Sequence, residues 1–363
     1  MNMYALFYAI NGVGLGHITR QLAIARKMKM ISPNITPLFF TTSEASNILY
    51  QHRIPYFKVP SKEIAEDCGL DKGSLGQFSF DVISNIIKIY KPKIFIVDTL
   101  IDGNFKELEQ ILTTPFDMKK VYIHRERKSE KMDENTFNLQ KYFDLVIAPH
   151  ETGRANIPVP PEKEIFWSGT ILVRDKEELL GKSNVLDMFN LPTEKKIIYV
   201  NFGGGGDATT EQNFKQVINT LSCRGDIHIV LTQAPLSKFK HDNIRNCTVI
   251  NWYPVIELMN LFDAAISATG YNTFHELLYS GVPSIFIPKK REYDDQEKRA
   301  KSVETFKAGF CILEEEINDN LNSRLDKLLE NRAEFSSAAQ KMVPSNGATS
   351  AAKKILSLIM EVV

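Results

Sequence analysis

Residues 266–283 read ISATGYNTFHELLYSGVP. The first residues are strand-like and end in small polar side chains, and a helix is predicted to begin near Tyr271. Gly281-Val282-Pro283 then ends this helix and leads into the next strand. A strand, a short polar turn and a helix form one unit of a parallel α/β sheet. The helix N-terminus suits a phosphate, and the carboxylate of Glu276, about one turn in, can accept both hydroxyls of a ribose.

The same alternation of strand-length apolar runs and helix-length amphipathic stretches occurs in two series along the chain. Strands are predicted at 4–10, 36–41, 56–59, 94–98, 120–124 and 144–148, then at 196–202, 227–231, 248–250, 264–267 and 283–287. The prolines at 158–161 and the stretch 165–173 are interpreted as a linker. We therefore predict an α/β protein with two Rossmann-like domains, at 1–172 and 173–345, and a helical tail at 346–363 that packs back across them.

The charge balance, the cysteine spacing and the length of the apolar runs exclude several classes of protein. The 363 residues carry 44 Lys plus Arg against 44 Asp plus Glu, so the formal charge of zero speaks against a general nucleic-acid binder. The four cysteines form no CxxC pair, which argues against a zinc site and a disulfide framework and fits a reducing cytoplasm. No apolar run reaches the ~20 residues that span a bilayer, so peripheral attachment stays open while spanning does not.

Two glycine-rich turns follow the opening strands of the two series. The first, NGVGLGHITR at 11–20, has glycines at 12, 14 and 16, which is not the GxGxxG spacing of a dinucleotide site, so we expect neither NAD nor FAD. The second, NFGGGGD at 201–207, presents several backbone N–H groups together, which suits a diphosphate; a flexible turn is the alternative.

Motifs along the whole chain resemble the GT-B glycosyltransferases, in particular the MurG-like branch with the peptidoglycan N-acetylglucosaminyltransferase and the UDP-glycosyltransferase superfamily. The resemblance extends to the glycosyltransferase family 28 type of C-terminal domain. It is carried, in order, by residues 14–17, 169–174, 203–206, 252–254, 270–276 and 295–296. It implies two facing Rossmann-like domains, with a nucleotide sugar bound mostly by the C-terminal one.

The resemblance also implies roles for single residues in donor binding. Trp252 would stack on or edge the base, Glu276 would hold the ribose hydroxyls, and Asp295 with Gln296 would contact the transferred sugar. The structural alternatives are a core aromatic for Trp252 and a helix-surface charge for Glu276. The full donor-binding set is Gly14, Gly16, Arg174, Gly203, Gly204, Gly205, Trp252, Tyr253, Thr269, Gly270, Tyr271, Asn272, Thr273, Glu276, Asp295 and Gln296.

For the chemistry, the resemblance implies that His17 removes the acceptor proton and that Asp98 orients it. His17 as a helix cap or acceptor contact, and Asp98 as a loop cap, are the alternatives. The expected activity is an inverting, metal-independent transfer of a hexose-type sugar, from a UDP-sugar by preference. No cofactor is expected, because the nucleotide sugar is itself a substrate. His275 is expected to be a structural neighbour.

Three other activities stay open. The first loop is also similar to that of the nucleotide-sugar hydrolase of pseudaminic acid synthesis, an epimerase of the same fold is another option, and a non-catalytic nucleotide-sugar-binding subunit is the third. The acceptor is a saccharide, a lipid-linked sugar or a small natural product, which places the protein in cell-envelope or natural-product glycosylation. The expected location is the cytoplasm, with the inner face of the membrane as an option. The basic segment 124–128 is interpreted first as a solvated face and second as a contact for an anionic acceptor or lipid head group.

Overall fold

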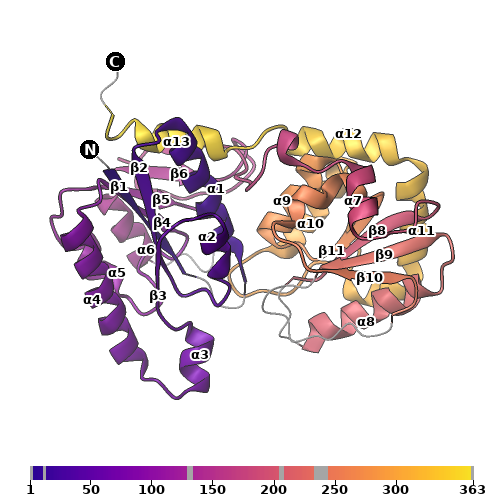
Figure 1. Cartoon of the computed structure of the whole chain (residues 1–363), viewed down its shortest axis with the longest axis horizontal. Coiled ribbons are helices and arrows are strands. Elements are labelled where there is room, and N and C mark those ends of the chain that lie inside the picture. The colour runs from indigo at the N-terminus through magenta and orange to yellow at the C-terminus, as the bar shows by residue number, and fades with distance from the viewer. Residues whose placement is uncertain (1–2, 11–13, 129–133, 204–207, 233–243, 361–363) are drawn as a thin grey trace. The chain divides into compact units, whose positions relative to one another are not determined.

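The chain forms two compact units. The computed structural model describes residues 3–10, 14–128, 134–203, 208–232 and 244–360, and all structural statements concern these residues. Unit 1 comprises Met1–Val173 together with Gly347–Val363, and unit 2 comprises Arg174–Asn346 (Figure 1). The two divisions fall one residue after the positions expected from the sequence, 172/173 and 345/346.

Unit 1 is built on a seven-stranded parallel sheet with the order β3-β2-β1-β4-β5-β6-β7. Its strands are β1 (Met3–Ala9), β2 (Ile35–Thr41), β3 (Tyr56–Lys58), β4 (Ile94–Asp98), β5 (Lys119–Ile123), β6 (Leu145–Ala148) and β7 (Ile165–Trp167). Its α-helices are α1 (Gly16–Ile31), α2 (Asn47–Gln51), α3 (Lys62–Asp67), α4 (Lys72–Tyr90), α5 (Leu108–Thr113), α6 (Glu134–Leu139) and α13 (Ala348–Leu356).

Side chains that alternate along the strands bury both faces of this sheet. Leu6 and Tyr8 of β1 pack with Ile83 of α4 and Ile111 of α5 on one face. Helices α1 and α13 cover the other face, which places helices on both sides of the sheet in Figure 1. Sheets buried on both faces have strands that are apolar almost throughout, as β1 and β4 are here.

Unit 2 repeats this plan with a six-stranded parallel sheet in the order β10-β9-β8-β11-β12-β13. Its strands are β8 (Lys196–Asn201), β9 (Ile227–Thr232), β10 (Cys247–Ile250), β11 (Ala264–Ser267), β12 (Ser284–Phe286) and β13 (Gly309–Cys311). Its α-helices are α7 (Lys182–Met188), α8 (Ala208–Ser222), α9 (Tyr271–Ser280), α10 (Gln296–Thr305), α11 (Ile317–Glu330) and α12 (Arg332–Met342). Leucines of α11 pack on one face of the sheet beside Val217 of α8, and α9 lies on the other face (Figure 1).

The predicted fold class, two Rossmann-like parallel-sheet units with a helical C-terminal region, is confirmed. In each sheet successive strands are added first on one side of the opening strand and then on its other side. The strand order therefore switches between β1 and β4 in unit 1 and between β8 and β11 in unit 2. Ligands of such sheets bind beyond the carboxyl ends of the strands at this switch point. The switch points therefore mark where functional side chains are to be sought.

Two local predictions were wrong. Ile165–Trp167, assigned to the linker, forms edge strand β7, because parallel pairing with β6 extends the sheet even though its side chains are only half-buried. Strand β13, Gly309–Cys311, was not predicted at all. Both are edge strands that are defined by their pairing with one neighbouring strand.

The last helix, α13, returns to unit 1 and packs against α1. Gly347, just before it, donates its N–H to the carbonyl of Thr170 at 2.6 Å, and a Cβ at this position would lie 2.4 Å from the carbonyl oxygen of Ser168. Only glycine permits this approach of two backbone segments. In α13 Ile355 and Leu356 are buried, as predicted, but the helix ends at Leu356 rather than near residue 360.

A search of the described residues for a helix of sufficient length and apolarity to cross a bilayer finds none.

Candidate functional site

The carboxyl edge of the unit 1 sheet brings His17 and Asp98 together. Asp98 is the last residue of β4, and His17 is the second residue of α1, which follows β1. The pair therefore spans the switch point between two neighbouring strands. The Nδ1 atom of His17 lies 3.3 Å from Oδ1 of Asp98, an ion-pair distance without the alignment of a hydrogen bond. The His17 side chain is 21% exposed, so a substrate can reach it.

Arg20 also binds the Asp98 carboxylate, and the sequence analysis did not identify this residue. Its Nε lies 2.9 Å from Oδ2 and its Nη2 lies 2.8 Å from Oδ1, a bidentate pair that is almost fully buried. Thr99 adds a hydroxyl donor to Oδ1 at 2.6 Å. Its spacing from His17 could have identified Arg20. Residues three apart on a helix share a face, and His17 was already expected to contact Asp98.

These contacts set the protonation states of the pair. Burial opposes ionisation of Asp98, but the charges of Arg20 and His17 outweigh it and hold the pKa of Asp98 far below its usual range. Burial lowers the pKa of His17, with the Asp98 carboxylate opposing this shift in part. His17 is therefore neutral at pH 7. With its Nδ1 proton directed to Asp98, its Nε2 atom carries the lone pair that can accept a proton.

The glycine loop before α1 is only partly described, since residues 11–13 lie outside the described ranges. Gly16 is the first residue of α1, and Leu15 at the N-cap position makes no side-chain cap bond. No atom lies within 4 Å of a Cβ built on Gly14 or Gly16, so both glycines border open space. This space adjoins the start of the helix that carries His17.

Segment 124–128 is less exposed than predicted. His124 is fully buried directly after β5, and both of its ring nitrogens lack a hydrogen-bond partner among the described residues. Burial lowers the pKa of His124 to about 4. The four residues that follow it are half-buried. The interpretation as a solvated face was therefore wrong, because the segment begins inside the sheet edge.

In unit 2 the starts of helices α9 and α10 and the residue Gly203 lie at the switch point. Helix α9 begins after Gly270, which serves as N-cap without a side-chain bond and whose built Cβ meets nothing within 4 Å. Gly203, after β8, has φ +75° and donates its N–H to Oδ1 of Asn201 at 2.7 Å. Positive φ favours glycine here. The predicted residues Gly204 and Gly205 lie outside the described residues.

Glu276 is a buried carboxylate without a hydrogen-bond or ion-pair partner among the residues that the structure describes. It lies on the second turn of α9, and only 7% of the residue is exposed. No hydrogen bond or ion pair to Glu276 occurs among the described residues, and burial raises its pKa to about 7. A buried carboxylate of this kind is stabilised once hydroxyl donors reach it. The sequence alternative, a charge on the helix surface, does not fit this burial.

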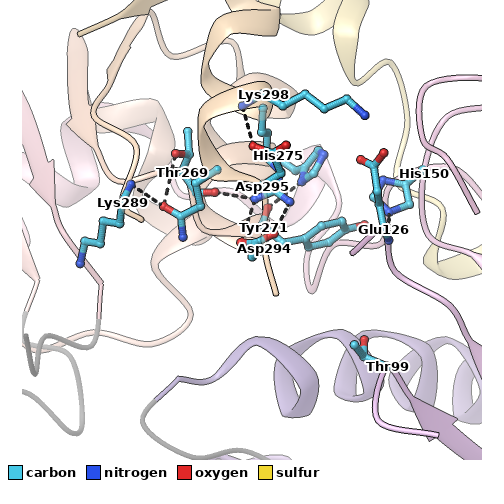
Figure 2. Close-up of polar contacts among 12 residues, drawn as sticks. Thr99, Glu126, His150, Thr269, Tyr271, His275, Lys289, Asp294, Asp295 and Lys298 are labelled. Carbon is cyan, nitrogen blue, oxygen red and sulfur yellow. Dashed lines mark hydrogen bonds and ion pairs between the residues drawn. The ribbon is translucent and has the colours of Figure 1, made fainter. Parts of the chain in front are cut away.

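Gln296 and Asp295 lie at the start of α10, beside the end of β11. Oε1 of Gln296 accepts from the backbone N–H of Lys289 at 3.1 Å and from the hydroxyl of Thr269 at 3.4 Å. Asp295 caps α10, because its Oδ1 accepts from the N–H of Lys298 at 3.0 Å (Figure 2). The amide nitrogen of Gln296 and Oδ2 of Asp295 have no partner within the described ranges. Both atoms suit sugar hydroxyls.

The remaining predicted residues are held by neighbours in unit 2. Arg174 donates from Nε to Glu257 at 2.6 Å, and the indole N–H of Trp252 donates to the other oxygen of Glu257 at 3.0 Å. Trp252 also packs edge-on against Phe189. Because its indole N–H is bonded to Glu257, only the ring of Trp252 can contact a base. Tyr253 precedes Pro254 through a cis peptide bond.

Three predicted residues form the first turn of α9: Tyr271, Asn272 and Thr273. The Thr273 hydroxyl accepts from Asn201 at 3.5 Å. His275 bonds through Nδ1 to the carbonyl of Tyr271 at 2.6 Å, as the dashed line between them in Figure 2 shows, and its ring lies against that of Tyr271. His275 is therefore engaged within its own helix, as expected of a structural neighbour.

No group of three or more His, Cys, Asp or Glu side chains that could hold a metal ion occurs in the parts of the chain that the structure describes.

Comparison with known proteins shows what this chain is similar to. Residues 207–358 match the glycosyltransferase family 28 C-terminal domain. The UDP-N-acetylglucosamine–N-acetylmuramyl-(pentapeptide) pyrophosphoryl-undecaprenol N-acetylglucosamine transferase of Thermosipho melanesiensis is 25% identical, over 96% of this chain and 98% of its own. The transferase of the same name from Thermosipho africanus is 28% identical, over 96% of this chain and 98% of its own.

Solved structures share the fold. The glycotransferase of kitacinnamycin superposes with a TM-score of 0.68 at 15% identity and covers 98% of both chains. MurG of Acinetobacter baumannii superposes with a TM-score of 0.61 at 12% identity, over 98% of this chain and 99% of its own. The sequence matches and the shared fold agree with each other. The chain is a glycosyltransferase with the GT-B fold, it is similar to the MurG-like enzymes, and its residues 207–358 match the family 28 C-terminal domain.

Proposed function

We propose that the protein transfers a hexose-type sugar from a UDP-sugar to an acceptor hydroxyl, with inversion at the anomeric carbon and without a metal ion or other cofactor. The observation that carries this proposal is the neutral His17 held against the ionised Asp98 at the switch point of unit 1. An imidazole of this kind is a general base for a hydroxyl proton.

The donor is assigned to unit 2 on the chemistry of its side chains. Glu276 has no hydrogen-bond or ion-pair partner in the described part of the chain and would accept the two ribose hydroxyls. The start of α9 at Gly270 would bind the diphosphate, and the amide nitrogen of Gln296 with Oδ2 of Asp295 would bind the sugar. Trp252 would contact the base through its ring. The curated relatives carry UDP-N-acetylglucosamine in their names, which favours a UDP-sugar.

The reaction is a single displacement. His17 takes the proton of the acceptor hydroxyl at Nε2, and the acceptor oxygen forms a bond to the anomeric carbon. The bond from that carbon to the phosphate oxygen breaks, and its electron pair leaves with the nucleoside diphosphate. One displacement inverts the anomeric centre. The helix start and the backbone N–H groups near it stabilise the departing charge, the role that a metal ion plays in other enzymes.

The acceptor is proposed to be lipid-linked and presented at the cytoplasmic face of a membrane. The names of the curated relatives include a pyrophosphoryl-undecaprenol acceptor. In unit 1, three apolar side chains of the α3 and α4 region are exposed: Ile64 at 41%, Leu70 at 44% and Phe78 at 53%. Such side chains suit peripheral contact with a lipid surface.

The test is nucleotide release from a panel of UDP- and dTDP-sugars, with and without a polyprenyl-diphosphate-linked sugar. Release that requires the acceptor supports transfer, release without any acceptor indicates the hydrolase, and binding without release indicates a non-catalytic subunit. If no nucleotide sugar binds, the proposal is wrong.

The His17→Ala variant tests the base. Turnover should fall by about 10²- to 10⁴-fold, the usual contribution of general base catalysis, while affinity for the UDP-sugar stays unchanged. His52→Ala, in the same unit, is the matched control and should keep full turnover. Normal turnover of His17→Ala would remove His17 from the mechanism.

A further inference from the structure

Thr99, the residue directly after Asp98, has a backbone conformation that threonine rarely adopts. Its φ is +65°, in the left-handed region. Across Thr99, the N–H of Leu100 donates to the carbonyl of Asp98 at 2.7 Å. A hydrogen bond between residues two apart, around a residue of positive φ, is typical of the rare and strained form of the γ-turn. For a β-branched residue such as threonine, a positive φ is a genuine outlier.

Two residues of the neighbouring strand β5 hold this turn in place. The N–H of Thr99 donates to the carbonyl of Ile123 at 3.0 Å, and the carbonyl of Thr99 accepts from the hydroxyl of Tyr122 at 2.9 Å. Thr99 and Tyr122 are both buried, so the hydroxyl bond is made away from water. A strained conformation persists only where the surrounding structure fixes it. Strand β5 therefore fixes the turn at Thr99.

The turn alone does not require threonine, because glycine would adopt the same φ without strain. Threonine adds a hydroxyl group, whose Oγ1 donates to Oδ1 of Asp98 at 2.6 Å. Oδ1 is the carboxylate oxygen that lies 3.3 Å from Nδ1 of His17. Arg20 binds the same carboxylate through both of its oxygens. The Thr99 hydroxyl therefore acts on the oxygen that faces the imidazole.

We propose that Thr99 is a positioning residue: its hydroxyl, set in place by the strained turn and by Tyr122, holds the Asp98 carboxylate so that Oδ1 faces Nδ1 of His17. The inference rests on the proposed function, in which His17 is the base. An Nδ1 proton directed to Asp98 leaves the Nε2 lone pair available for the acceptor proton. Thr99 itself touches no reacting atom and keeps its proton. The strain orients the base before any substrate arrives.

Three substitutions of Thr99 separate the hydroxyl from the turn. Thr99→Gly adopts the turn without strain and removes the hydroxyl, Thr99→Val keeps the shape of the side chain and removes the hydroxyl, and Thr99→Ser keeps the hydroxyl. Tyr122→Phe removes the donor to the Thr99 carbonyl. Thr113→Val is the matched control in the same unit, because the hydroxyl of this exposed threonine donates within its own helix, α5. Circular dichroism confirms that each variant is folded.

The first measurement is turnover of the UDP-sugar. The kcat of Thr99→Gly and Thr99→Val should fall by about 10- to 100-fold, the range for a lost hydrogen bond to a charged group, while KM for the UDP-sugar stays unchanged. Tyr122→Phe should lower kcat by about 2- to 10-fold, the range for a bond between neutral groups. Thr99→Ser should keep most of the wild-type kcat, and Thr113→Val should match the wild type.

The second measurement needs no substrate. Nitrogen NMR of protein labelled at histidine reports which ring nitrogen of His17 carries the proton at pH 8, and the His17→Ala variant assigns its signals. The wild type and Thr99→Ser should carry the proton at Nδ1. Thr99→Gly and Thr99→Val should show a mixture of both tautomers. A role of Thr99 in the turn alone would not change this signature.

A wild-type kcat or an unchanged His17 tautomer in Thr99→Gly would overturn the inference, because residue 99 would then serve only the turn. Equal losses in Thr99→Ser and Thr99→Val would overturn it as well, because the methyl group rather than the hydroxyl would matter. A wild-type protein that turns over no sugar nucleotide would instead count against the proposed function. The tautomer of His17 would still decide the role of Thr99, so the two failures are distinguishable.

Discussion

Asp98 and Glu276 are buried carboxylates at the carboxyl edges of the two sheets, and their pKa values are shifted in opposite directions. Asp98 in unit 1 is surrounded by Arg20, His17 and Thr99, and its pKa lies far below the usual range. Glu276 in unit 2 has no such partners among the described residues, and burial raises its pKa to about 7. The charge of Asp98 is balanced inside the protein, whereas the proposed function assigns the hydroxyls of a ligand to Glu276.

In the proposed function, this difference matches two tasks: the sheet edge of unit 1 orients the base, and the sheet edge of unit 2 binds the ligand. A base must be oriented before any substrate arrives, so its supporting ion pair is complete in the free protein. A binding group gains most when its charge is satisfied only by the ligand, because the release from an unfavourable burial adds to the affinity. Four measurements can break or sharpen this contrast.

The largest effect is expected for Asp98→Asn. It leaves the buried guanidinium of Arg20 without a counter-charge, which typically lowers stability by about 3–5 kcal/mol. Urea unfolding of unit 1 can be followed through Trp167 in a Trp252→Phe background, since these are the two tryptophans of the chain and they lie in different units. Asp117→Asn, an exposed carboxylate paired with Lys93, is the control and should change stability by less than ~1 kcal/mol. If Asp98→Asn changed the free energy of unfolding only slightly, the ion pair between Asp98 and Arg20 would not be what stabilises the site.

The wild-type pH dependence of unit 1 follows from the same shift. Because the folded pKa of Asp98 is depressed, its contribution to stability is present above the unfolded value of about 3.9 and is lost as pH falls toward the folded pKa. Unfolding curves of the Asp98→Asn variant should lack this acid-dependent component. Parallel pH profiles of the two proteins would contradict the assignment.

The next effect is expected on ligand affinity in Glu276→Gln. Loss of a carboxylate that accepts two hydroxyls should weaken binding of UDP-N-acetylglucosamine by about tenfold or more. In the wild type, affinity should fall as pH is lowered below about 7, because a protonated Glu276 must first release its proton. The variant should show no such dependence, and the exposed-residue control Glu330→Gln should behave as the wild type. Equal pH profiles for Glu276→Gln and the wild type would show that the ribose binds elsewhere.

The smallest effect is a gain in stability of unit 2 in the same variant. A carboxyl whose folded pKa is raised destabilises the protein above that pKa, and this penalty fades as pH falls from about 7 toward the unfolded value. Glu276→Gln should therefore raise the free energy of unfolding by about 1–2 kcal/mol at pH 8, with less gain at pH 5. Unfolding followed through Trp252 in a Trp167→Phe background provides the measurement. A loss of stability at pH 8 would show that Glu276 has a structural partner.

Much of the fold could be predicted from the sequence, because strands buried on both faces stand out as apolar runs between helical stretches. Strands β7 and β13 were missed, because each is defined by its pairing with one neighbouring strand at the edge of a sheet. His17 and Asp98 were identified through the family resemblance. Arg20 was not, because its role depends on a partner 78 residues away, Asp98, which only the folded sheet brings near.

The return of α13 to unit 1 has a consequence for synthesis on the ribosome. Unit 2 is one continuous stretch, Arg174–Asn346, whereas unit 1 includes a second segment, Gly347–Val363, which leaves the ribosome after all of unit 2. Unit 2 can therefore fold while unit 1 still lacks the helix that covers α1. Nascent chains halted before residue 347 should hold unit 1 with an apolar face uncovered, which makes them substrates for chaperones.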